Sequence, residues 1–152
     1  MLKKIFFAAA VIGLSAMAVS AQAAQSFTIE GTNALRFSQA HLTVKPGEKI
    51  TIKLVNKSVL PASAMAHNWI LLKSGADAAA FDRAAMTTPD NGYFPRTKAG
   101  EVIAHTSLVA GGHADSVTFT APDKPGDYEY ICTFPGHLAA GMKGTMTVQA
   151  DG

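Results

Sequence analysis

The chain has 152 residues, of which 48% are hydrophobic and 16% charged, and its 13 Lys and Arg nearly balance its 11 Asp and Glu. This length and apolar content predict one compact domain and exclude an intrinsically disordered chain. The bases are not gathered into a basic stripe, so nothing in the composition indicates nucleic-acid binding. The single cysteine excludes an internal disulfide and a zinc site built on several cysteines.

The first 23 residues are predicted to form a signal peptide. Lys3 and Lys4 precede an uncharged apolar run from Ile5 to Val19, and Ala21-Gln22-Ala23 supplies the small residues that a signal peptidase requires. The apolar run is too short and too rich in alanine to predict a membrane span, and no second run follows it. We therefore expect an exported protein of the bacterial periplasm, with no membrane span in the mature form.

The mature domain, residues 24–152, reads as short strands separated by turn residues. Several segments alternate polar and apolar residues, as strands with one buried face do, and Gly, Pro or Asp bounds most of them. A switch to apolar residues at helical spacing from Ala76 to Met86 predicts one short helix. The expected strands are Ser26–Glu30, Leu35–Phe37 continued by His41–Val44, Ile50–Val55, Trp69–Leu72, Val102–Leu108, Asp115–Thr120, Tyr128–Cys132 and Gly144–Val148. Seven to eight such strands predict an all-β fold, a Greek-key β-sandwich with a short inserted helix.

Three potential metal ligands follow one another near the C-terminus. Cys132, His137 and Met142 lie at intervals of five residues, on a loop that leaves a predicted strand. A thiolate, an imidazole and a thioether are soft or borderline ligands, and together they favour copper. One loop cannot surround a metal ion, so a further ligand is expected from elsewhere. His67 is the candidate, because it stands where a loop runs into an apolar strand.

Simpler interpretations of these residues remain open. Cys132 could be a buried free thiol, and Met142 could fill space in the core, as methionine often does. His41, His105 and His113 lack ligand-like spacing and are predicted to be surface or hydrogen-bonded residues. A thiol hydrolase with Cys132 as nucleophile is a competing function, although no known nucleophile signature surrounds this cysteine.

Four segments resemble the azurin and auracyanin family of blue copper proteins. They are Ala66-His67-Asn68-Trp69, Val102-Ile103-Ala104-His105-Thr106, Asp115-Ser116-Val117-Thr118-Phe119 and Cys132-Thr133-Phe134-Pro135-Gly136-His137, in the order of that family. The resemblance implies a cupredoxin fold that binds one mononuclear type 1 copper. It also implies a monomeric periplasmic electron carrier, not an enzyme, with transient partners such as a cytochrome c or a copper reductase. Copper storage or chaperone activity is the alternative function.

The resemblance also implies roles for particular residues. His67, Cys132 and His137 would form the trigonal ligand plane, Met142 would be the weak axial ligand, and the Ala66 carbonyl would approach the copper from the other side. Asn68, Thr133 and Phe134 would surround and support these ligands. An apolar docking patch around the exposed edge of His137 would consist of Leu35, Leu60, Met65, Phe134 and Pro135.

This sequence departs from azurin in the loop between the last two ligands. Azurin has three residues between its final histidine and methionine, whereas residues 138–141 make four here, as in auracyanin and plastocyanin. The longer loop leaves two arrangements open, one in which Met142 approaches the copper and one in which the Ala66 carbonyl also does. The disulfide of azurin has no counterpart, because Cys132 is the only cysteine.

Overall fold

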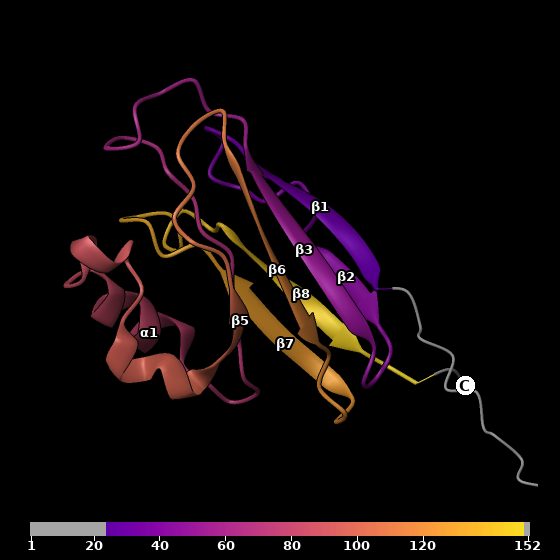
Figure 1. Cartoon of the computed structure of the whole chain (residues 1–152). Helices are drawn as coiled ribbons and strands as arrows, with labels where there is room; N and C mark the ends of the chain where they lie inside the picture. Colours follow the sequence, from indigo (N-terminus) through magenta and orange to yellow (C-terminus); the bar gives the residue numbers. More distant parts are fainter. Residues whose placement is uncertain (1–23, 151–152) are drawn as a thin grey trace, which may run out of the picture.

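The computed structural model describes residues 24–150, and the predicted signal peptide lies outside them. Eight strands form two sheets that face one another, with the ligand-bearing loops at one end (Figure 1). The three-stranded sheet has the order β1 (Gln25–Gly31), β3 (Lys49–Asn56) and β6 (Ala114–Thr120). The five-stranded sheet has the order β2 (His41–Val44), β8 (Lys143–Val148), β7 (Gly126–Ile131), β4 (Ile70–Leu72) and β5 (Val102–His105). The predicted cupredoxin-like sandwich is confirmed.

The chain passes between the sheets after each of its first three strands. β1 pairs in parallel with β3, and β2 pairs in parallel with β8, while the other pairings are antiparallel. Two parallel strands cannot be joined by a tight hairpin, so the intervening segments must cross to the opposite sheet. The first and third of these crossings, residues 32–40 and 57–69, carry loops at the ligand end of the sandwich, whereas the turn at 45–48 lies at the other end.

The core between the sheets follows from the period-two pattern of the strands. In β3, Ile50, Ile52 and Leu54 are fully buried, and the residues between them face outward. Trp69 connects the two layers, because its ring lies 6.0 Å from that of Phe119 in β6 and 5.4 Å from that of Tyr130 in β7. This packing makes the layer directly beneath the candidate ligands rigid.

The inserted helix lies outside the sandwich. Helix α1 (Ala78–Ala85) is capped by the side chain of Asp77, which accepts a hydrogen bond from the Ala80 N–H at 2.9 Å. Phe81 of this helix packs with Ile70, Leu72 and Ile131 on the outer face of the five-stranded sheet. Figure 1 shows α1 beside β5. Within residues 24–150, no helix is long and apolar enough to cross a membrane.

Several boundaries differ from the expectation. The strand predicted at Leu35–Phe37 is wrong: Leu35 adopts a left-handed φ of 55°, its N–H closes a turn on the Thr32 carbonyl, and only Phe37 makes an isolated bridge, to Gly31. β5 ends at His105 instead of Leu108, and Trp69 and Cys132 lie just outside their strands. Two 3-10 helices, η1 (Pro89–Asn91) and η2 (Arg96–Glu101), were not anticipated.

Candidate metal centre

Three buried side chains converge at the loop end of the sandwich. The Nδ1 atoms of His67 and His137 lie 3.2 Å apart, and Cys132 Sγ lies 3.4 Å from His137 Nδ1 and 4.0 Å from His67 Nδ1. All three residues are buried. Within the described part of the chain, this is the one cluster of three or more His, Cys, Asp or Glu residues that could hold a metal ion. His41, His105 and His113 are not part of it, as predicted.

Backbone hydrogen bonds hold the loops that carry these side chains. His67 and Val109 exchange two bonds, with N···O distances of 3.1 and 2.7 Å. Cys132 N donates to the Met142 carbonyl at 3.1 Å, and Met142 N donates to the His137 carbonyl at 2.9 Å. The segment from Cys132 to Met142 therefore folds back on itself, and its geometry does not depend on a bound metal ion alone.

The electrostatic state of the three groups suits metal binding. Burial lowers the pKa of both His67 and His137 to about 4, so their imidazoles are neutral and able to act as ligands at pH 7. Burial raises the pKa of the Cys132 thiol to about 12, and the backbone N–H groups of Asn68 and Phe134 oppose this effect. The thiolate form thus needs a cation beside it, which a metal ion would supply while displacing the proton.

The spacing of the three atoms fits a trigonal metal ion. Bonds of about 2.0–2.1 Å to nitrogen and about 2.3 Å to sulfur, arranged in a plane, require ligand atoms about 3.5–3.8 Å apart. The observed separations of 3.2, 3.4 and 4.0 Å bracket this range. One thiolate and two imidazoles in a plane, with a weak axial ligand, is the donor set of blue copper sites.

Met142 and Ala66 are both buried beside this cluster. Met142 is fully buried, and its backbone is bonded to both Cys132 and His137. Ala66, also fully buried, directly precedes His67. The backbone of Met142 thus contacts two of the three donor residues, and Ala66 adjoins the third in the sequence.

Asn68 joins the loop of His67 to the loop of Cys132. Its Oδ1 accepts a hydrogen bond from the Thr133 N–H at 2.8 Å, and its Nδ2 donates to Thr133 Oγ1 at 2.9 Å and to the Gly92 carbonyl at 3.2 Å. The Thr133 hydroxyl in turn donates to the Tyr93 carbonyl at 2.6 Å. Every polar atom of both side chains is thus used to fix the separation of the two loops.

A profile of the family described as copper binding proteins, plastocyanin/azurin family, matches residues 23–149. The chain belongs to this family. It is 37% identical to azurin of Pseudomonas aeruginosa over 153 residues, covering 98% of this chain and all of that one. It is 41% identical to auracyanin-B of Chloroflexus aurantiacus over 117 residues, which are 76% of this chain and 48% of that one. The chain thus spans about half the length of auracyanin-B.

Solved structures agree with this assignment. An auracyanin from Roseiflexus castenholzii superposes with a TM-score of 0.75 at 34% identity, covering 85% of this chain and 100% of that chain. Auracyanin A from Chloroflexus aurantiacus, described as a blue copper protein, superposes with a TM-score of 0.75 at 37% identity, covering 84% and 100%. The predicted cofactor, copper, is confirmed by the family and by the donor set.

Two further residues support His67 in this plastocyanin/azurin family member, and the first of them, Gly31, was not assigned to the site from the sequence. A Cβ atom at Gly31 would lie 2.6 Å from His67 Cδ2, so glycine alone lets β1 pass this close to the imidazole. His67 Nε2 is buried without a well-oriented hydrogen-bond partner, although the Thr32 backbone weakly raises the pKa of the ring. A glycine at the end of a strand often marks a close approach by another group, but the sequence does not indicate which residue approaches.

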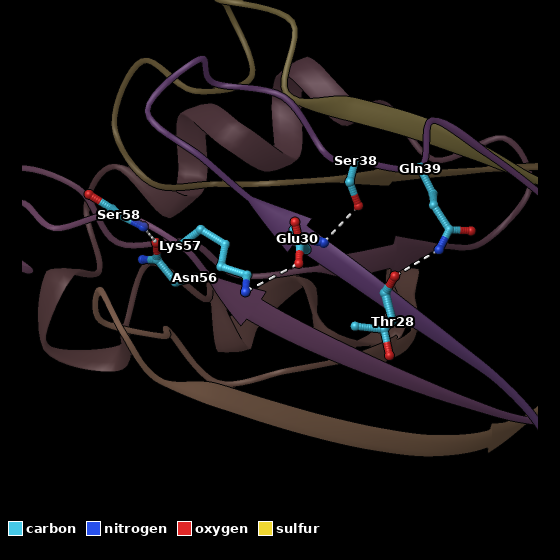
Figure 2. Close-up of polar contacts among 7 residues, drawn as sticks. All are labelled: Thr28, Glu30, Ser38, Gln39, Asn56, Lys57 and Ser58. Carbon is cyan, nitrogen blue, oxygen red and sulfur yellow. Dashed lines mark hydrogen bonds and ion pairs between the residues drawn. The ribbon is translucent and has the colours of Figure 1, made fainter.

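Asn56, at the end of β3, is the second support. Its Nδ2 donates to the Val109 carbonyl at 2.9 Å, the same carbonyl that accepts from His67 N. Its Oδ1 accepts from the Ser58 N–H at 2.9 Å, which fixes the start of the loop that leads to His67 (Figure 2). The buried Asn56 side chain therefore anchors both segments that form the bridge at His67.

The predicted docking residues differ in how far they reach the surface. Leu60 is 41% exposed and Pro135 is exposed, whereas Leu35 and Met65 are half-buried. Phe134 is buried, with its ring 4.7 Å from that of His137. Val59, which was not predicted, is the most exposed large apolar residue of the described chain at 93%.

Proposed function

We propose that this protein is a periplasmic carrier of single electrons that uses one mononuclear type 1 copper. The observation that carries the proposal is the triangle of His67 Nδ1, His137 Nδ1 and Cys132 Sγ, buried and already formed. Bound copper supplies the one-electron couple between Cu(I) and Cu(II). A site that holds its ligands in place before and after the change of charge needs little rearrangement, and this favours rapid electron transfer.

The protein residues have distinct roles in this proposal. His67, Cys132 and His137 would hold the copper, and Met142 and the Ala66 carbonyl would supply weaker contacts to it. The N–H groups of Asn68 and Phe134 donate to the cysteine sulfur, and this stabilises negative charge on it. Asn68 and Thr133 keep the two ligand loops at a constant separation.

Electrons would enter and leave through His137. His137 is 3% exposed, whereas His67, Cys132 and Met142 are 0% exposed. Leu35, Leu60, Met65, Phe134 and Pro135 would form the apolar docking patch around it, where a partner excludes water during a brief contact. A cytochrome c or a copper reductase is the expected kind of partner, and the carrier itself is expected to act as a monomer without enzymatic activity.

Export is part of the proposal. Residues 1–23 would be removed as a signal peptide, leaving the copper-binding domain at 24–152. Expression of the full chain in a Gram-negative host should give periplasmic protein with a mass that corresponds to cleavage before Ala24. An uncleaved chain in the cytoplasm would contradict this part of the proposal.

Copper storage or delivery is the competing function, and copper retention distinguishes the two. A carrier should cycle between Cu(II) and Cu(I) many times in the presence of a strong external Cu(I) chelator without losing metal. A storage protein should release its copper to the chelator when reduced. The fully buried Cys132 and the closed backbone loop around it favour retention.

A further inference from the structure

The charges around the proposed electron-transfer face are unevenly distributed. The four loop segments at this end of the sandwich are residues 31–40, 57–69, 106–113 and 132–142, and they contain no Asp or Glu. All eleven acids of the chain lie elsewhere. The four segments contain one arginine, Arg36, and one lysine, Lys57. These four segments therefore carry two bases and no acid, and Asp90 lies in the adjoining segment, whose Gly92 and Tyr93 carbonyls accept hydrogen bonds from Asn68 and Thr133.

Lys57 and two acids that border these segments, Glu30 and Asp115, are already engaged. Lys57 Nζ lies 3.4 Å from Glu30 Oε1, at the end of β1 (Figure 2). Asp115, at the start of β6, accepts hydrogen bonds from both the N–H and the hydroxyl of Ser107, each at 2.7 Å. These contacts neutralise Lys57 and hold both carboxylates at the edges of the two outer strands.

Arg36 differs because it has no acidic partner. Its side chain is exposed, and no carboxylate of residues 24–150 forms an ion pair with it. Its Nη1 donates to the carbonyls of Leu35 and Ala140, which orient the guanidinium without cancelling its charge. Ala140 belongs to the loop between His137 and Met142, and a Cβ atom at Gly141 would lie 3.2 Å from the Arg36 Cζ. The uncompensated cation is therefore fixed directly on the proposed ligand loop.

The segment that carries Arg36 is itself held in place. Ser38 Oγ accepts from the Glu30 N–H at 2.8 Å, and Gln39 Nε2 donates to the Thr28 carbonyl at 2.7 Å (Figure 2). Leu35 is kept in a left-handed conformation, with a φ of 55°, that a non-glycine residue rarely adopts. A strained and anchored turn keeps Arg36 at a constant position relative to His137.

We propose that this end of the molecule docks a redox protein whose contact surface is acidic, with Arg36 as the cation that recognises it. The inference rests on the proposed electron-carrier function and specifies its partner. Opposite charges steer encounter and fix orientation, while the apolar residues Val59, Leu60 and Pro135 supply the contact that excludes water. Docking of a second copy through the same face would place two uncompensated cations in one interface, which favours a different protein as the occupant.

The test uses the copper-loaded, reduced protein and two one-electron oxidants of opposite charge. Hexacyanoferrate(III), an anion, and tris(phenanthroline)cobalt(III), a cation, each take one electron from Cu(I), giving Cu(II) and the reduced reagent. Arg36→Gln is compared with Arg83→Gln, which changes the net charge equally but lies on α1, outside the four loop segments. Arg36→Lys retains the charge. Rates are measured by stopped flow over a range of salt concentrations and corrected for the measured potentials.

With the anionic oxidant at about 10 mM salt, Arg36→Gln should react about three- to ten-fold more slowly than wild type. Arg83→Gln and Arg36→Lys should stay within about two-fold of wild type. The difference should disappear near 0.3 M salt, and the cationic oxidant should show the opposite trend. Two c-type cytochromes of opposite net charge should then repeat the pattern. The acidic cytochrome should be reduced faster than the basic one, and only its rate should fall in Arg36→Gln.

The acidic-partner inference would be overturned if Arg36→Gln and Arg83→Gln changed the rate with the anionic oxidant equally, or if the basic cytochrome reacted faster than the acidic one. Either result would leave the carrier function intact. Failure of the carrier function is recognised separately. In that case the wild-type protein would show no blue band and no electron transfer to either oxidant at any salt concentration.

Discussion

At the scale of single residues, the metal centre depends on close contacts that surround the proposed ligands. Gly31, Asn68 and Asn56 bind no metal in this account, yet each fixes one of the loops that present the ligands. A site formed before metal binding needs such supports, since ligand positions must hold through a change in the charge of the ion.

Replacing Gly31 by alanine should disturb the site by steric pressure on His67. The new Cβ would lie 2.6 Å from His67 Cδ2, so the imidazole or β1 must move. We expect a loss of about 1–3 kcal/mol in the free energy of unfolding and a shifted, weaker blue band. Gly100→Ala is the matched control, because a Cβ there meets nothing within 4 Å. Identical spectra for both variants would show that Gly31 does not position His67.

Replacing Asn68 by alanine should separate the two ligand loops. The Thr133 N–H would lose its partner while still buried, and this costs about 2–4 kcal/mol together with the other lost bonds. Copper release to a chelator should accelerate at least ten-fold. Thr133→Val retains the bond from its N–H to Asn68 and should show a smaller effect. Denaturation curves and release kinetics measure the two quantities, and unchanged release in Asn68→Ala would contradict the proposed role.

The metal-free protein should lose stability when the pH falls from about 6.5 to 4. His67 and His137 have folded-state pKa values near 4, below the ordinary value of 6.5, so the unfolded chain binds more protons in this interval. Stability therefore rises with pH across it, by up to about 3 kcal/mol for each histidine. Urea denaturation at several pH values tests this. The His113→Asn control should show the same change of stability with pH as the wild type. A wild-type stability that does not change between pH 6.5 and 4 would contradict the prediction.

At the scale of elements, the strands and the metal motif could be predicted from the sequence for different reasons. Buried and less buried residues alternate along β3 and β8 because one face of each strand is buried. Cys132, His137 and Met142 are close in the chain, so their spacing can be recognised in the sequence. The turn at Leu35 escaped prediction because its left-handed conformation is imposed by tertiary contacts on a residue that does not favour it. The hydrogen bond of Asn56 was not predicted because its partner Val109 is 53 positions away.

Helix α1 should contribute to stability without contributing to the metal site. Phe81 fills the small cluster between α1 and the outer face of the five-stranded sheet. Phe81→Ala should therefore lower the free energy of unfolding by about 3–4 kcal/mol and leave the visible spectrum of the copper-loaded protein unchanged. Val59→Ala, at a site that is 93% exposed, should change stability by less than about 0.5 kcal/mol. A spectral change in Phe81→Ala would show that α1 is coupled to the metal centre.

At the scale of the whole molecule, the domain lacks the crosslink that stabilises azurin, and its single cysteine lies among the proposed ligands. Copper should therefore be a major source of stability. A metal ion at about 1,000 times its Kd stabilises the folded state by about 4 kcal/mol, which for a domain of this size raises Tm by roughly 10–20 °C. Calorimetry of the metal-free and copper-loaded protein checks this, and coincident transitions would contradict it.

The proposed function requires that Cys132 bind copper as a thiolate in a type 1 site. The visible and EPR spectra of the purified protein after addition of Cu(II), recorded beside those of Cys132→Ala, show whether it does. We predict an intense blue band with a narrow copper hyperfine splitting, both of which disappear in the variant. A colourless protein, or an ordinary tetragonal Cu(II) spectrum that persists in Cys132→Ala, would contradict the account.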